Sequence, residues 1–133
     1  MAKIMLVDDD TDFLAIQRRV LETQGHTVVT VDRADKAVDL ATVEKPDLVV
    51  MDLMMEDEDA GFSLCYKIKK GLAGRPLPVI MITGVGTEHG FTFTNEGSEP
   101  GAWIKADLFL NKPIRPEELI GAVNKLLKKE QGR

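Results

Sequence analysis

The sequence predicts an α/β fold in which helices cover both faces of a parallel sheet. Two observations predict it. Short runs rich in β-branched and other apolar residues alternate along the chain with longer segments whose apolar residues recur at helical spacing. The short runs are almost continuously apolar, which is typical of strands buried on both faces. Such a succession favours parallel βαβ units with right-handed crossovers.

Four apolar runs are the predicted strands, and a weaker run follows them near the end of the chain. In order they are Ile4 to Val7, Thr27 to Val31, Asp47 to Met51, Pro78 to Thr83 and, as the weakest, Leu108 to Leu110. Val and Ile dominate most of them, as expected of strands that pack on both faces. The sequence therefore predicts a sheet of five strands.

The segments between these runs carry apolar stripes whose ends have recognisable signals. The four stripes are Phe13 to Leu21 closed by Gly25, Ala34 to Ala41 before Pro46, Phe62 to Ile68 closed by Gly71, and Leu119 to Leu127 opened by Pro116. The interval from Gly84 to Asp107 has five glycines, one proline and no helical stripe. A helix there is expected to be short, irregular or missing.

The composition bounds the class of protein. A chain of 133 residues with 44% hydrophobic residues fits one globular domain. The net charge of -5 disfavours a protein that grips nucleic-acid backbones or anionic lipid. The only cysteine, Cys65, excludes an internal disulfide and is predicted to be a small core residue. The apolar runs are too short to cross a bilayer, so we expect a soluble, cytoplasmic protein.

Polar residues terminate four of the five predicted strands. Asp8 to Asp10 follow the first strand, Asp52 the third and Asn111 to Pro113 the fifth, while Thr83 ends the fourth. In an open parallel sheet the carboxyl ends of the strands lie at one edge, where ligands bind. We therefore expect several carboxylates, one hydroxyl and the ammonium of Lys112 to meet there.

Asp52 is expected to be buried at a cost in free energy, because apolar residues flank it on both sides. A buried carboxylate needs a counter-charge, and neighbouring carboxylates repel one another unless a cation joins them. A donor set of oxygens alone suits Mg²⁺, which also accepts phosphate oxygens as ligands. Asp52 could then attack an electrophile and accept a phosphoryl group, with Lys112 and Thr83 contacting the phosphoryl oxygens.

Four fragments, in order, carry a family resemblance: IMLVDDD, VVMDLMM, VIMITG and LFLNKPIRP. Together they resemble the response-regulator receiver domain of two-component signalling, the CheY-like family, over nearly the whole chain. The resemblance implies a flavodoxin-like three-layer sandwich whose five-stranded parallel sheet has the order 2-1-3-4-5. It also implies a Mg²⁺ cofactor and a cis peptide bond before Pro113.

The resemblance further implies a role for each site residue. These roles are phosphoryl acceptor for Asp52, direct Mg²⁺ ligand for Asp9, support of the hydrated ion for Asp8, main-chain carbonyl ligand for Met54, phosphoryl contacts for Thr83 and Lys112, and switch residues for Thr83 and Phe109. Asp10 is more consistent with a helix cap than with a ligand.

The partners implied are a sensor histidine kinase or phosphotransfer protein as donor and an unidentified downstream protein as target. Residues 1–133 are expected to be a single receiver domain, monomeric or weakly dimeric, without an effector domain, enzymatic activity, or direct contact with nucleic acid or membrane. Three features depart from the family pattern: Glu56 replaces a proline, Phe109 replaces the frequent tyrosine, and the interval from Thr83 to Lys112 is long.

Three other interpretations compete. In the first, Asp8 to Asp10 do nothing more than cap a helix, which would leave Asp52 and Lys112 unexplained. A Mg²⁺-dependent aspartyl-phosphate phosphatase or phosphotransferase of the haloacid-dehalogenase kind would place a second aspartate two positions after Asp52, where this chain has Met54. A flavin-binding module would offer hydroxyls and amides in its first loop, whereas three aspartates repel a phosphate.

Overall fold

The computed structural model describes residues 2–52, 60–71, 77–83 and 106–131. Five strands form one parallel sheet in the order β2-β1-β3-β4-β5. The strands are β1 (Lys3–Val7), β2 (Thr27–Val31), β3 (Leu48–Asp52), β4 (Val79–Thr83) and β5 (Leu108–Asn111). The described helices are α1 (Thr11–Glu22), α2 (Ala34–Glu44), α3 (Ala60–Lys69) and α6 (Pro116–Gln131). The predicted fold class and strand order are confirmed.

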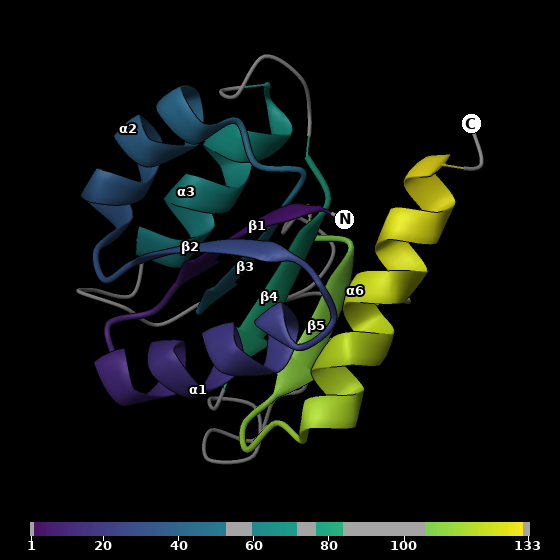
Figure 1. The fold of residues 1–133 in the computed structure, drawn as a ribbon. Coiled ribbons are helices and arrows are strands. Elements are labelled where there is room, and N and C mark those ends of the chain that lie inside the picture. Colours follow the sequence, from purple (N-terminus) through teal and green to yellow (C-terminus); the bar gives the residue numbers. More distant parts are fainter. Residues whose placement is uncertain (1, 53–59, 72–76, 84–105, 132–133) are drawn as a thin grey trace.

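Helices lie on both faces of this sheet, as Figure 1 shows, with α2 and α3 on one face and α1 and α6 on the other. Alternate strand residues supply the two cores. Met5, Val49 and Met81 pack toward α2 and α3, whereas Ile4, Val50 and Ile80 pack toward α1 and α6. Because both faces are covered, every position of a central strand can be apolar. This arrangement explains the continuous apolar runs in the sequence.

The strand boundaries differ from the predicted ones by one residue at several ends. The third strand begins at Leu48 instead of Asp47 and includes Asp52 as its last residue. Asp47 instead lies before the strand and accepts a hydrogen bond from the main-chain N–H of Lys3 at 2.8 Å. Asp52 is therefore fixed by the β3–β4 register, opposite Ile82. A carboxylate on a strand backbone is held more firmly than one on a loop.

A partly buried ion pair holds the start of β5. Asp107 Oδ2 accepts hydrogen bonds from Lys69 Nζ and from the main-chain N–H of Val79, both at 2.8 Å. The main-chain N–H of Asp107 donates to the carbonyl of Val79 at 2.9 Å. Lys112 directly follows the other end of this short strand.

Three predictions fall partly or wholly outside the described residues. Met54 and the segment 84–105 are not described, so the metal role of Met54 and the form of the fourth helix stay predictions. The backbone of Thr83 ends β4 and pairs with Asn111, but its side chain is not among those described. None of the described helices has both the length and the apolar composition needed to cross a bilayer.

Candidate functional site

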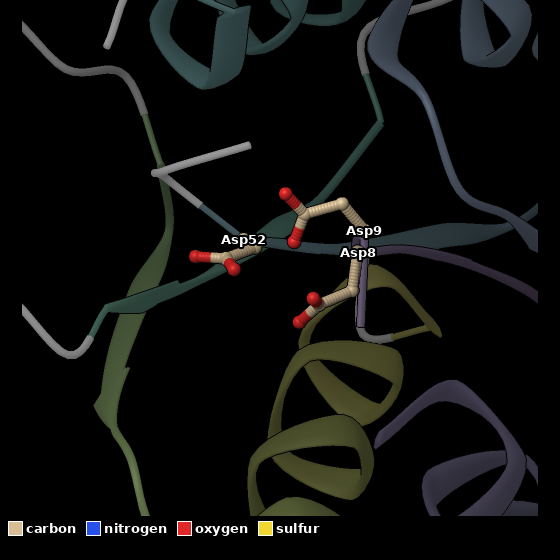
Figure 2. A group of neighbouring side chains, drawn as sticks. All are labelled: Asp8, Asp9 and Asp52. Carbon is tan, nitrogen blue, oxygen red and sulfur yellow. The ribbon is translucent and has the colours of Figure 1, made fainter. Parts of the chain in front are cut away.

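Three carboxylates converge at the carboxyl edge of the sheet. Asp8 and Asp9 follow the end of β1, and Asp52 ends the neighbouring strand β3. Figure 2 shows the three carboxyl groups near one another, with Asp8 and Asp9 extending toward Asp52. One oxygen of each carboxylate lies within 4.8 Å of the other two. The sequence prediction that these residues meet is confirmed.

Lys112 brings a positive charge to the same place from the end of β5. Its Nζ lies 3.2 Å from Asp8 Oδ2 and 3.3 Å from Asp52 Oδ2. The peptide bond between Lys112 and Pro113 is cis, as the family resemblance implied. The Lys112 ammonium thus bridges two carboxylates from different strands.

Burial dominates the electrostatics of this group. Asp8 is 1% exposed and Asp52 is 6% exposed. The pKa of Asp8 is raised from 3.8 to about 6: burial is the largest cause and the Asp52 charge adds to it, while the Asp10 N–H and Lys112 oppose the increase. Burial alone would lower the pKa of Lys112, but Asp52 and Asp8 outweigh it, so that pKa is raised and the side chain stays charged. One ammonium does not fully compensate the carboxylates.

Local hydrogen bonds give the three consecutive aspartates three different environments. Asp8 Oδ1 accepts from the main-chain N–H of Asp10 at 2.9 Å. Asp10 Oδ1 accepts from the N–H groups of Asp12 and Phe13, both at 3.1 Å, and so caps α1. Asp9 is exposed. The prediction that Asp10 caps the helix is confirmed.

The donor set fits a divalent cation. Asp8 Oδ2 is buried and has no hydrogen-bond partner, although Lys112 Nζ lies at ion-pair distance. The three acidic side chains offer oxygen atoms only, which suits Mg²⁺ better than a soft metal. Asp8, Asp9 and Asp52 are the described residues that would hold it.

Phe109 and Phe13 differ in what their rings contact. Phe109 is partly buried and packs against the core on the α2 and α3 face. The ring of Phe13 lies under Lys112, with 4.6 Å between Nζ and the ring centroid. From the sequence, Phe13 is predicted only as an apolar helix residue. Its place four positions after Asp9, in the first turn of the helix, is the one signal that it faces the site.

Cys65 is 1% exposed and lies in the core on α3, as predicted. His26 accepts a hydrogen bond from the main-chain N–H of Ala2, so it is a structural residue at the opposite end of β1 from the acidic group. Neither residue contributes to the site.

The chain matches the family model described as "Response regulator receiver domain" over residues 4–124. The transcriptional regulatory protein GltR of Pseudomonas aeruginosa is 32% identical over 96% of this chain and 50% of its own length. The alkaline phosphatase synthesis transcriptional regulatory protein PhoP of Bacillus subtilis is 28% identical over 97% of this chain and 50% of its own length. This chain therefore spans about half the length of these relatives.

Solved structures agree with the fold. The receiver domain of a Francisella response regulator is 26% identical with a TM-score of 0.77, covering 98% of this chain and 99% of that chain. A two-component response regulator from Clostridium difficile has a TM-score of 0.80 at 22% identity, covering 98% of both chains, and supports the fold alone. The fold of this chain is therefore one that solved structures of response regulators share.

Proposed function

This chain belongs to the response regulator receiver domain family, and from that premise we propose that phosphorylation of Asp52 switches its contacts with other proteins. One observation carries the proposal. The Lys112 ammonium lies between Asp52 and Asp8, at 3.3 and 3.2 Å, on a sheet edge where three carboxylates converge. The Lys112 ammonium is thus close enough to contact a phosphoryl group attached to Asp52.

Asp52 is the best-placed acceptor among the three acids. Asp8 is almost fully buried, at 1% exposed, and Asp9 is exposed. Asp52 is 6% exposed and fixed on the central strand β3. A covalent change on a central strand reaches the packing of both faces, which makes it a suitable trigger for a conformational switch. Thr83 and Phe109 keep their proposed switch roles.

The proposed reaction moves a phosphoryl group from a phosphohistidine of a kinase or phosphotransfer protein. An oxygen of Asp52 forms a bond to phosphorus, the P–N bond breaks, and its electron pair returns to the imidazole nitrogen, which takes up a proton. Lys112 offsets the charge of the phosphoryl oxygens. Bound Mg²⁺, held by Asp8, Asp9 and Asp52, with the Met54 carbonyl proposed as a further ligand, would neutralise the remaining negative charge.

The test uses the purified chain, Mg²⁺ and acetyl phosphate as donor. Intact-protein mass spectrometry should detect one added phosphoryl group on the wild type and none on Asp52→Asn. Asp12→Asn is the matched control, because Asp12 is an exposed acid of the first turn of α1 and should leave phosphorylation unchanged. Phosphorylation of another residue in Asp52→Asn would disprove the assignment.

A Mg²⁺-dependent aspartyl-phosphate phosphatase or phosphotransferase remains the second candidate. Both reactions begin with the same phosphoryl transfer to Asp52. The curated relatives are named as regulators rather than enzymes, which favours the switch. Turnover of p-nitrophenyl phosphate that disappears in Asp52→Asn would favour the enzyme.

The proposed output is contact with a downstream protein. The named relatives are transcriptional regulatory proteins of about twice this length, so coupling to a gene-regulatory output is the natural form for such a switch. The single-domain organisation of residues 1–133, the monomeric or weakly dimeric state and the cytoplasmic location stay predictions.

A further inference from the structure

We propose that Phe13 positions Lys112 for the phosphoryl transfer, by holding its ammonium against the face of an aromatic ring. The inference rests on the proposed function, because it names a residue that acts on Asp52 chemistry through Lys112. The observation that carries it is the 4.6 Å distance between Lys112 Nζ and the Phe13 ring centroid. This distance lies well within the range of a cation–π contact.

The Phe13 ring is part of a series of contacts that starts and ends at Asp8. Asp8 Oδ1 accepts from the Asp10 N–H at 2.9 Å, and Asp10 Oδ1 accepts from the Phe13 N–H at 3.1 Å. The Phe13 ring contacts Lys112 Nζ, which lies 3.2 Å from Asp8 Oδ2. The cap therefore fixes the backbone of Phe13 relative to Asp8. The Phe13 ring contacts the same Lys112 ammonium that pairs with the Asp8 carboxylate.

Lys112 needs such support because its stem is long and its side chain is 28% exposed. A lysine side chain loses considerable rotamer freedom when it is held in one place. Phe13 is itself partly buried and packs against the core between the sheet and helices α1 and α6. The ring is thus anchored and offers the ammonium a fixed surface.

A ring face supports the ammonium differently from a carboxylate. The attraction comes from the ring quadrupole, so it takes up no hydrogen-bond acceptor and cancels no charge. The ammonium keeps its charge and its N–H donors for oxygen atoms at Asp52. A divalent cation competes with Lys112 for Asp8 and Asp52, but it does not compete for a ring that the lysine already covers. Among the described contacts of Lys112, the one with Phe13 is therefore the one that can keep the ammonium near Asp52 throughout the reaction.

The first test replaces Phe13 with cyclohexylalanine, which keeps the shape and removes the π electrons. Phosphorylation by acetyl phosphate should slow about three- to tenfold, the range expected of a partly desolvated cation–π contact. Site-specific fluorination of Phe13 should slow it step by step as the ring face becomes less negative. The thermal midpoint should stay unchanged across this series. An equal rate throughout, or a loss of rate that follows the loss of stability, would overturn the proposal.

The chain offers a matched control on α3. Lys70 Nζ lies 5.3 Å from the centroid of Tyr66, an exposed residue away from the acidic edge. Replacing Tyr66 with leucine removes a cation–π contact of the same kind and should leave the phosphorylation rate unchanged. A similar slowing in Tyr66→Leu would show a general effect and count against Phe13.

A second measurement separates this proposal from the proposed function. In the magnesium-free protein, the ring current of Phe13 should shift the NMR signals of the Lys112 ε-methylene protons upfield, and cyclohexylalanine should abolish that shift. Absence of the shift in the wild type disproves the contact whether or not Asp52 is phosphorylated. A wild type that shows the shift but takes up no phosphoryl group disproves the proposed function, and with it the positioning role.

Discussion

Replacing Asp8 with asparagine should stabilise the magnesium-free protein at neutral pH. Asp8 is 1% exposed, and its pKa is raised from 3.8 to about 6, chiefly by burial. The folded state therefore holds the Asp8 proton more tightly than the unfolded chain does. Asparagine resembles the protonated form in shape and charge, so the variant avoids the cost of ionising this side chain.

The magnitude follows from the change in pKa. A rise from 3.8 to about 6 means that ionised Asp8 destabilises the fold by up to about 3 kcal/mol at pH 7. The wild type should lose this stability as the pH rises from about 4 toward 7, since the folded state binds the extra proton in that window. The advantage of Asp8→Asn should therefore be largest near pH 7 and vanish near pH 4.

Urea unfolding in the presence of a chelator measures the difference. For a chain of this size, a gain of about 2 kcal/mol moves the midpoint upward by about 1 M. Mg²⁺ should reduce the advantage of the variant, because the ion stabilises the wild type by mass action. Asp12→Asn is the control, because Asp12 is exposed and should give no gain. A variant less stable than the wild type at pH 7, or an equal gain at pH 4 and pH 7, would refute the reasoning.

Three further changes test other parts of the structure. Asp10→Ala removes the acceptor of two N–H groups at the start of α1 and should cost about 0.5–2 kcal/mol in urea unfolding, and no loss would contradict the capping role. Ile68→Ala opens a cavity at a fully buried position of α3 and should cost about 2–5 kcal/mol by the same assay, so a cost below that range would mean that the core closes around it. Lys112→Met leaves Asp8 and Asp52 without their bridging cation and should lower stability by about 1–3 kcal/mol in chelator, and a variant as stable as the wild type would mean that the bridge contributes nothing.

Much of this site follows from the sequence because parallel strands end at one edge. Once Ile4 to Val7 and Asp47 to Met51 are predicted as strands, the acids after them must come near one another. The structure confirms this for Asp8, Asp9 and Asp52. It differs by including Asp52 in the strand, since the β3–β4 pairing extends to the residue opposite Ile82. Pairing is a property of two strands, and one strand's sequence does not fix where it stops.

The sequence by itself determined the order of the elements, the two apolar faces of each strand and the acids at the strand ends. Each of these depends on spacing along the chain, which a periodic pattern records. The tertiary structure decided the distances. It placed Lys112 against Asp52, 60 residues away in the chain, and against the ring of Phe13. It also buried Asp8, exposed Asp9 and made Asp10 a helix cap, although all three residues are aspartates. Burial and contact are set by what packs from elsewhere in the chain, so identical neighbours can have different chemistry.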